Sequence, residues 1–496
     1  MNRIIGLLLL SGFILPVTAQ RTLSLDSCRA LALRNNKQVS VSKMKQEIAS
    51  NIRKSARTKY LPHVNVLGAY EYMSKEVSLL NNTQKDLLSN LGTRVGEQAT
   101  GVLTTMMQSP FMANVISQLS AAFQMSPQDM ITGMAQGLNA QGQKIVDGFR
   151  TDTRHTFAGS VVVTQPVFMG GAIIAMNKMA DIGERMTHNS MDEQLQHTIY
   201  TTDQAYWQVV SLKHKKRLAE SYLALVKKLS DDVDKMIREG VATRSEGLSV
   251  DVKENEAEMQ VTMVNDGLVL AKMYLCQLCG LPLDTDLVLE DEDADYLQVE
   301  SDTPQMNMET AFSNRPELRL LQNTVDLSKQ ATNILRATQL PQVLLMGGYA
   351  VSNPNLFNGF EKKFAGFWNV GVLVRIPVWN WGDVAYKVRA SKGATAIANL
   401  ELQEAREKVE LQVNQMQFKV DESSKRLLMA QANIRRAEEN LRTATLGFQE
   451  GVIQSTTVME AQTAWLQAQT QKIDAEIDVR LSQVNLRKAL GTLGVN

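Results

Sequence analysis

The chain has 496 residues, of which 44% are hydrophobic, and it carries 52 basic and 52 acidic side chains. This balance offers no electrostatic reason for binding nucleic acid. Beyond residue 20 there is no run of about 18 apolar residues, the length that a helix needs to cross a bilayer, so an inner-membrane pump or transporter is excluded. A segment that enters a membrane must therefore do so as β-strands.

The N-terminus has the pattern of a secretory signal peptide. Arg3 precedes an apolar run over residues 4–15, and the small residues at 17–19 are typical of a signal-peptidase site. We therefore expect a signal peptide over residues 1–19 and a mature chain that starts at Gln20. No cysteine follows this site, which disfavours a lipid-anchored form.

Two similar halves follow, as self-comparison of the sequence shows. Positions up to 70 recur 279 residues later (341 − 62), and positions from 166 onward recur 211 residues later (377 − 166). The 68-residue difference (279 − 211) predicts an insertion in the first half. We therefore expect a first structural repeat over 20–280 with an insertion at about 74–154, an acidic connector over 281–306 at the equator of the molecule, and a second repeat over 307–496.

Alternation of apolar and other residues predicts one two-stranded hairpin in each half. Ser160, Thr164, Asn369 and Arg375 fall on the face opposite the apolar one, which would be the lumen, while the apolar face would meet lipid. Aromatic residues gather at the strand ends, where interfacial girdles belong. The apolar face comprises Val64, Val66, Gly68, Tyr70, Tyr72, Phe157, Gly159, Val161, Val163, Val343, Leu345, Gly347, Tyr349, Val351, Trp368, Val370, Val372, Val374 and Ile376.

The insertion joins the two strands of the first hairpin. Ser109-Pro110 and Ser126-Pro127 each place an N-cap residue before a proline at the first helical position, which predicts at least two short amphipathic helices. Thioether sulfurs can ligate copper(I), but apolar packing is the interpretation that we favour for the methionines of this segment. They are Met106, Met107, Met112, Met125, Met130 and Met134.

Each half continues into a very long helix. Between residues 383 and 446 no proline interrupts a stretch whose apolar positions, from Val409 to Ala444, alternate in steps of four and three. Ser423 is the exception in this seam, and Lys216 and Ser230 are the exceptions in the matching seam of the first half. The spacing is typical of a coiled coil. A helix of about 65 residues is roughly 100 Å long, which suits an extended assembly rather than a compact domain.

Four strands are too few to close a barrel, because closed barrels need about eight, and open sheet edges do not face lipid. The pattern therefore requires association of several copies. Two copies would supply eight strands and three would supply twelve, and the periodicity leaves both open.

Several motifs, in this order, resemble the TolC-type outer-membrane efflux protein family. They are the segment at 25–36, the Leu-Pro pairs at 61–62 and 340–341, the prolines that end the returning strands, and the Gly-Val pairs at 240–241 and 451–452. The strand–helix junction prolines are Pro62, Pro166, Pro341 and Pro377. The resemblance covers essentially the whole mature chain.

The resemblance implies a mainly α-helical protein with membrane β-strands, a TolC-like channel-tunnel of two tandem repeats. Its homotrimer would form a 12-stranded β-barrel among the lipids of the bacterial outer membrane and an α-helical barrel in the periplasm. The implied partners are a periplasmic adaptor, also called a membrane fusion protein, and an inner-membrane pump. The implied protein is an export duct and not an enzyme, and it needs no cofactor or metal.

The resemblance also assigns roles to the helical tips. Gly240, Val241, Gly451 and Val452 would dock the adaptor. Carboxylates beyond the tips contribute to a cation-selective periplasmic gate in the family, and the matching positions are Glu246, Thr457 and Glu460. Charge rings of this kind can focus cations in a pore. Phe448 and Ile453 stand where the family's type example has an aromatic residue and an arginine that bond neighbouring helices, with Arg244 as the candidate substitute for that arginine.

Other chemistry is weakly indicated. Cys276 and Cys279 lie on a predicted helix without a second ligand pair, and Cys28 could form a disulfide with one of them in an oxidising periplasm. The five histidines lack metalloprotease spacing. The acidic stretch from Asp284 to Asp302 lacks the glycine and spacing of a calcium loop, and we expect it to be a solvated connector.

Two classes of function remain. A transport conduit fits the hairpins, with small-molecule or multidrug efflux favoured over a type I protein secretion outlet, and with metal efflux as the weakest variant. An exported coiled-coil surface scaffold would explain the heptads, but it would not explain the duplicated hairpins with aromatic ends.

Overall fold

The computed structural model of the chain describes residues 22–151, 153–294 and 307–494. The chain divides into two units. The helical unit contains residues up to 56, 174–336 and those from 381 onward, and the sheet unit contains residues 57–173 and 337–380. The predicted signal peptide, 1–19, lies outside the described residues.

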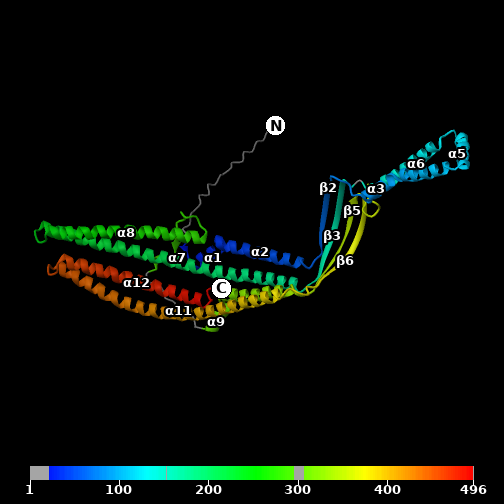
Figure 1. Cartoon of the computed structure of the whole chain (residues 1–496). Coiled ribbons are helices and arrows are strands. Elements are labelled where there is room, and N and C mark those ends of the chain that lie inside the picture. The colour runs from blue at the N-terminus through cyan, green and yellow to red at the C-terminus, as the bar shows by residue number, and fades with distance from the viewer. Residues whose placement is uncertain (1–21, 152, 295–306, 495–496) are drawn as a thin grey trace, which may run out of the picture. The chain divides into compact units, whose positions relative to one another are not determined.

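The helical unit is built from two sets of matching helices (Figure 1). The first set is α1 (Leu25–Asn35), α2 (Lys37–Thr58), α7 (Ala172–Arg238) and α8 (Arg244–Cys279). The second set is α9 (Met308–Asn314), α10 (Pro316–Ala337), α11 (Asp383–Gln449) and α12 (Ser455–Ala489). Two very short strands, β1 (Thr22–Leu23) and β4 (Val288–Leu289), pair in parallel, and a 3-10 turn at Glu290–Asp293 follows.

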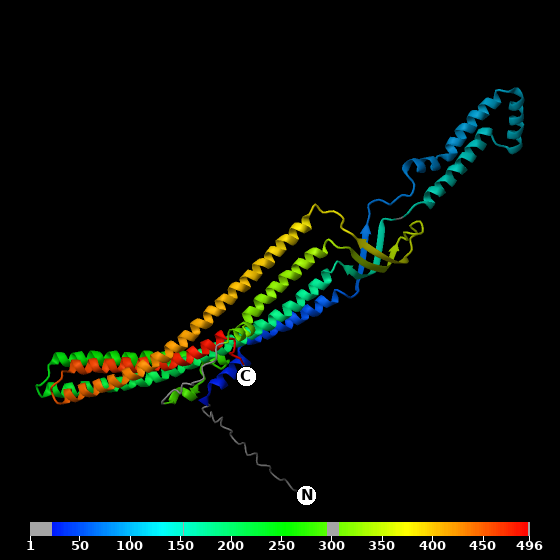
Figure 2. The ribbon, with the colours of Figure 1, turned by 90° about the horizontal axis from the view of Figure 1, so that it is seen from below.

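The predicted tandem repeat is confirmed by the bounds of these helices. Helices α7 and α11 each have 67 residues and begin 211 positions apart (383 − 172). Helices α8 and α12 also begin 211 positions apart (455 − 244). In both views α8 runs back alongside α7, and α12 runs back alongside α11 (Figures 1 and 2). The four long helices therefore form two matching hairpins.

The predicted coiled-coil seams are packed inside the helical unit. Val420 and Val209, which occupy matching positions (420 − 211), are 3% and 0% exposed. Two of the three polar exceptions have partners on a neighbouring helix. Ser423 is buried and its hydroxyl lies 2.9 Å from that of Ser482 on α12. The Lys216 ammonium donates to Asn265 Oδ1 on α8 at 2.7 Å. Polar residues within a seam are tolerated when their bonding groups are satisfied in this way.

The sheet unit holds four antiparallel strands in the order β2-β3-β5-β6. They are β2 (His63–Tyr72), β3 (His155–Met169), β5 (Gln342–Asn353) and β6 (Ala365–Arg375). The register places Val66 opposite Val161, Val161 opposite Tyr349, and Tyr349 opposite Trp368. The predicted apolar residues of the four strands therefore share one face. Strands β2 and β6 form the two edges of this open sheet.

One junction proline lies elsewhere than expected. Pro62, Pro341 and Pro377 flank their strands, but Pro166 lies inside β3, where the register with β5 shifts between Pro166 and Phe168. Proline cannot donate to a ladder and is confined to edges and bulges. Because β2 pairs with β3 only as far as Thr164, the strand is locally an edge at Pro166. A proline therefore fits within β3 at this bulge.

The predicted helices of the insertion are present, and the described residues between β2 and β3 form four of them: α3 (Asn82–Ser89), α4 (Leu91–Met107), α5 (Pro110–Phe123) and α6 (Pro127–Gly148). Proline is the first residue of α5 and α6, as the two Ser-Pro pairs predict. None of the described helices combines the length and apolar character that a bilayer-spanning helix needs.

The acidic connector differs from the expectation that it is solvated. Glu292, in the 3-10 turn, is 1% exposed, and its carboxylate lies 3.1 Å from the ammonium of Lys272. Tyr206 on α7 donates its hydroxyl proton to Asp291 Oδ2 at 2.6 Å. Buried charges need such partners, so this turn is anchored to α7 and α8. The later part of the connector, 295–306, lies outside the described residues.

The three cysteines are free thiols in the buried core where α1 meets α8. Cys28, Cys276 and Cys279 are each 0% exposed. Contact with the Cys279 thiol, together with burial, raises the pKa of Cys28. Thiols that are fully buried are inaccessible to reagents, and we therefore expect these cysteines to remain unlabelled by thiol reagents in the folded protein.

Candidate functional site

The two helical hairpins end in tips of the same backbone geometry. At the first tip Gly240 has φ +79°, and Val241 N donates to Met236 O at 2.9 Å. At the second tip Gly451 has φ +75°, and Val452 N donates to Gly447 O at 2.9 Å. A left-handed glycine with this pattern of bonds is the Schellman motif that ends a helix. Glycine is needed at both positions because other L-residues are strained at positive φ.

At the first tip α8 begins with a capping box. The Thr243 hydroxyl accepts from Glu246 N at 3.3 Å, and Thr243 N donates to Glu246 Oε2 at 2.8 Å. This reciprocal arrangement satisfies two backbone donors at the helix start. The pattern Thr-x-x-Glu was present in the sequence, yet we predicted only a gate carboxylate at this position. Glu246 therefore has a structural role in each chain, whether or not it also acts at a gate.

At the second tip α12 begins without a capping box. Gln454 and Thr457 occupy the positions of Thr243 and Glu246, and the N-cap residue Gln454 makes no side-chain capping bond. The next residue, Ser455, is 3% exposed, and its hydroxyl has no hydrogen-bond partner. The polar groups at the start of α12 therefore make fewer hydrogen bonds than those at the start of α8.

We expect Thr243→Ala to increase amide hydrogen exchange in the first turn of α8, because the hydroxyl acceptor at the N-cap is lost. Such caps contribute about 1 kcal/mol, which corresponds to roughly a fivefold rise in local opening. The matched control is Gln454→Ala, which removes no capping bond and should leave the first turn of α12 unchanged. Equal increases at both tips would contradict this account of the capping box.

A cavity of about 410 Å³ lies between the two tips. It is lined by Val233, Met236, Val241, Ala242, Glu246, Phe448, Gly451, Val452, Ile453, Gln454 and Ser455. Phe448, at the end of α11, is 7% exposed and belongs to a buried cluster with Val233 of α7 and Val458 of α12. Ile453 packs against the same cluster. The contact between the tips inside one chain is therefore apolar.

The structure brings some of the predicted gate residues together. Glu246, Phe448 and Ile453 line the tip cavity, whereas Thr457, Glu460 and Arg244 are exposed outside it. Among the ion pairs of the described residues, none includes Arg244. Within one chain Phe448 and Ile453 thus form a hydrophobic contact, and Arg244 does not supply the missing charge.

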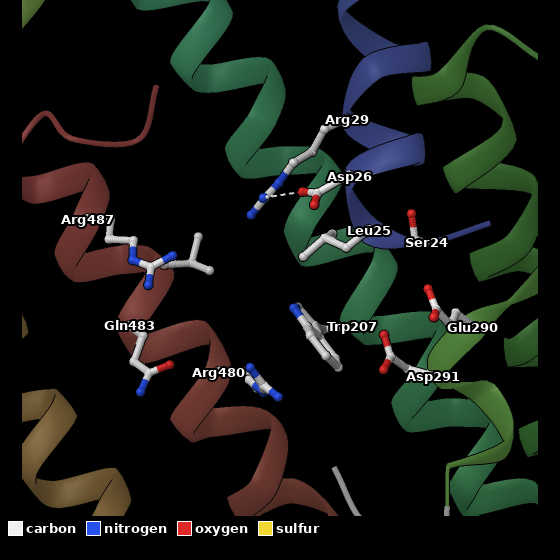
Figure 3. Close-up of a pocket in the computed structure, with 11 residues that line it drawn as sticks. Ser24, Leu25, Asp26, Arg29, Trp207, Glu290, Asp291, Arg480, Gln483 and Arg487 are labelled. Atoms are coloured by element: carbon white, nitrogen blue, oxygen red, sulfur yellow. Dashed lines mark hydrogen bonds and ion pairs between the residues drawn. The ribbon is translucent and has the colours of Figure 1, made fainter. Parts of the chain in front are cut away.

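A second cavity, of about 290 Å³, lies near the start of α1, and no pattern in the sequence predicts it (Figure 3). Arg29 on α1 donates to both carboxylate oxygens of Asp203 on α7, through Nε and Nη2, each at 2.7 Å. The Arg29 Nη1 also donates to Asp26 at 2.9 Å. On the other side of the cavity the Arg480 guanidinium stacks on Trp207, 5.3 Å from the ring centroid. These contacts connect α1 and α12 to α7.

Asp203 is the most buried charge in this cluster, with 0% exposure. Burial raises the pKa of its carboxyl, and the hydrogen bonds from Arg29 act in the opposite direction. A bidentate arginine is the strongest common partner for a carboxylate. Asp203 and Arg29 are 174 positions apart in the chain, and no spacing rule relates them.

Comparisons with known proteins agree with this architecture. Residues 307–492 match the family model described as outer membrane efflux protein. The outer membrane protein TolC of Vibrio cholerae is 25% identical over 171 residues, which cover 34% of this chain and 39% of that protein. The aligned segment thus spans well under two thirds of this curated relative.

Solved structures share the fold over nearly the whole chain. The outer-membrane channel OprN has a TM-score of 0.72 at 13% identity, with 94% of this chain and 90% of that chain covered. The MtrE outer membrane channel of Neisseria gonorrhoeae has a TM-score of 0.68 at 15% identity, with 95% and 89% covered. The outer membrane protein VceC of Vibrio cholerae has 0.67 at 12%, with 94% and 96% covered.

These similar proteins are outer-membrane proteins and channels rather than enzymes. Their likeness in structure, the family match in the second repeat and the duplicated architecture of the chain agree with one another. Over residues 307–492 the chain therefore matches the outer membrane efflux protein family, and over nearly its whole length it shares the fold of outer-membrane channels.

Proposed function

We propose that three copies of the chain form an export duct in the bacterial outer membrane, which accepts cargo from an inner-membrane pump through a periplasmic adaptor. The open sheet with one continuous apolar face carries this proposal. Val66 and Trp368, which lie on that face in the two edge strands, are 77% and 76% exposed. Apolar side chains in such an arrangement suit contact with lipid.

The sheet also supports association of copies. Strands β2 and β6 have no neighbour on their outer sides within the described chain. Backbone groups left unpaired in lipid are costly, so membrane sheets close on themselves. Pairing of β2 of one copy with β6 of the next would satisfy both edges. Three copies would supply twelve strands, the number that the family resemblance favours.

The tips support the proposed docking of an adaptor. Val241 and Val452, which follow the glycines of the two tips, are 72% and 79% exposed. Large apolar side chains at the ends of helical hairpins are unfavourable in water and suit a protein contact. Gly240 and Gly451 hold these valines in place through the Schellman motifs. For cargo we propose small molecules, since the family description refers to efflux.

The test is to reconstitute the purified protein in planar bilayers, to record single-channel currents across salt gradients, and to measure the mass of the detergent complex. We expect a trimer whose conductance prefers cations. We expect that preference to fall when Glu246→Gln and Glu460→Gln are combined, because two rings of charge are removed. The control is Glu401→Gln, an exposed carboxylate on α11 far from the tips in sequence, which should leave the preference unchanged.

One result would contradict the proposed duct, and another would contradict only the proposed gate. A monomer that stays soluble without detergent and conducts nothing would favour the exported scaffold instead. A conducting trimer whose ion preference responds equally to Glu401→Gln and to the tip substitutions would leave the duct in place and remove the gate from the tips.

A further inference from the structure

The helical insertion between β2 and β3 has an unusual surface. From Gln98 to Gln143 the chain contains a single charged residue, Asp129. That carboxylate accepts from the Ser126 hydroxyl at 2.5 Å, next to the start of α6. Helices on a soluble surface normally carry many charges on their outer face. The surface of α4, α5 and most of α6 is therefore poorly suited to water.

The inner contacts of the insertion are already satisfied. A Cβ atom at Gly92 would collide with the backbone of Ala135, and one at Gly142 would collide with the backbone of Leu88. Asn139 Oδ1 on α6 accepts from the backbone N of Gly92 on α4 at 2.7 Å. Helices α3 and α4 therefore pack closely on one face of α6. The exposed apolar residues belong to other faces of the insertion and are not gaps in this packing.

The outer faces expose a set of large apolar side chains. The Phe111 side chain is 75% exposed and that of Met134 is 60% exposed. The other members of the set are Val95, Val102, Met106, Met107, Val115, Leu119, Met125, Met130 and Ile145. An apolar cavity of about 270 Å³ opens among α4, α5 and α6, and Leu119, Met130 and Met134 are part of its lining. Apolar surface on this scale marks an interaction site.

The outer face of α6 also has the shape of a helix contact. Gly133 and Gly137 lie one helical turn apart, and open space surrounds the position of a Cβ atom at each. Small residues at this spacing leave a groove in which another helix can approach closely. Met130 and Met134 lie along one side of the groove, and methionine adapts readily to an apolar partner. We call Gly133, Gly137, Met130 and Met134 the α6 face.

We propose that the α6 face packs against the insertion of a neighbouring copy of this chain, so that the insertions associate at the mouth of the assembly. This inference rests on the proposed trimer. Strand β2 is an edge strand that needs a neighbouring copy, and nine residues separate the end of β2 from α3, the first helix of the insertion (82 − 72, less one). The edge that pairs with the next copy therefore continues directly into the insertion. The lack of charge favours an identical apolar surface over a charged partner.

The consequence is a helical cap that each copy contributes and none can form alone. In a single copy the methionine side chains of the insertion are exposed to water. Packing against the insertion of a neighbouring copy would bury them, which is favourable. The insertion joins the end of β2 to the start of β3, so the cap would restrict the duct at that end of the strands.

The test uses Met134→Cys in the full-length reconstituted protein, with a short bismaleimide as the cross-linker. The three native cysteines are buried and supply no background. The matched control is Gln136→Cys, an exposed position on the other side of α6. We expect cross-linked dimers and trimers with cysteine at 134 and at least tenfold fewer at 136. The trimer itself is measured separately, by the mass of the detergent complex without cross-linker.

A second variant fills the groove. Gly133→Leu combined with Gly137→Leu should abolish cross-linking at 134 while the mass remains that of a trimer, since both positions have open space in the single chain. A trimer that does not cross-link at 134, or that cross-links equally at 136, would overturn the inference and leave the proposed function intact. Absence of a trimer would overturn both. A bimane label at 134 that shifts its emission on anionic and neutral lipid vesicles, without cross-linking, would assign the face to the bilayer and overturn the inference.

Discussion

Phe448→Ala should loosen the two helical tips and raise the single-channel conductance of the reconstituted protein. Phe448 is 7% exposed and fills the contact between α7, α11 and α12 beside the tip cavity. Removing a buried phenylalanine ring costs about 3–5 kcal/mol, and here the loss would fall on the segment that holds the tips together. We expect a lower melting temperature by circular dichroism together with a larger or more frequently open channel.

The control for this prediction is Phe418→Ala, the same substitution on the same helix at a side chain that is 74% exposed. It should change neither the melting temperature nor the conductance. If Phe448→Ala lowers the melting temperature and leaves the conductance unchanged, then the tips are not the narrowest part of the duct.

Arg29→Met should strongly destabilise the helical unit. It leaves the carboxylate of Asp203, which is 0% exposed, without the two hydrogen bonds that it accepts from Arg29. Breaking a buried pair in this way costs about 3–5 kcal/mol. The measurement is thermal unfolding in detergent, followed at 222 nm.

The loss of stability caused by Arg29→Met should grow as the pH rises. Burial raises the pKa of Asp203 above its ordinary value even with Arg29 present, and loss of Arg29 raises it further. A raised folded-state pKa gives stability that is present below the unfolded pKa, about 3.9, and is lost as the pH rises through the folded value. The melting temperature of Arg29→Met should therefore approach that of the parent near pH 4 and fall away toward pH 7.

A matched control for this pair lies between α2 and α7. Arg53 donates to Asp181 at 2.7 Å and to Glu184 at 2.8 Å, but its side chain is 35% exposed. Arg53→Met should produce a much smaller change with little dependence on pH, because exposed pairs are screened by solvent. Equal effects at Arg53 and Arg29 would show that burial of Asp203 is not the cause.

The repeat, the long helices and the faces of the strands were predictable because each rests on a local period. The recurrence at 211 positions fixes the relation between α7 and α11, and alternation along β2 and β6 fixes which side chains share a face. The spacing along α11 identifies Ser423 as a break in the seam. It does not identify Ser482 as its partner, because the period of one helix does not show which residues of α12 lie opposite.

The features that were missed depend on contacts between distant parts of the chain. Nothing in the sequence near Glu292 indicates that Lys272 will cover it, so the acidic connector was predicted to be solvated throughout. The same holds for Arg29 and Asp203. The capping box of Thr243 and Glu246 is different, because the Thr-x-x-Glu pattern is local and could have been recognised in the sequence. It was missed because the family resemblance had already given Glu246 another role.

The equal length of α7 and α11 limits how this chain can change through evolution. A residue deleted from one helix alone would draw its tip back by about 1.5 Å and rotate everything beyond the deletion by roughly 100°. The two tips would then no longer meet around Phe448. Deletions and additions in these helices must therefore occur in matched pairs, one in each half of the gene. The insertion between β2 and β3 has no counterpart in the second repeat, so its length is free to vary on its own.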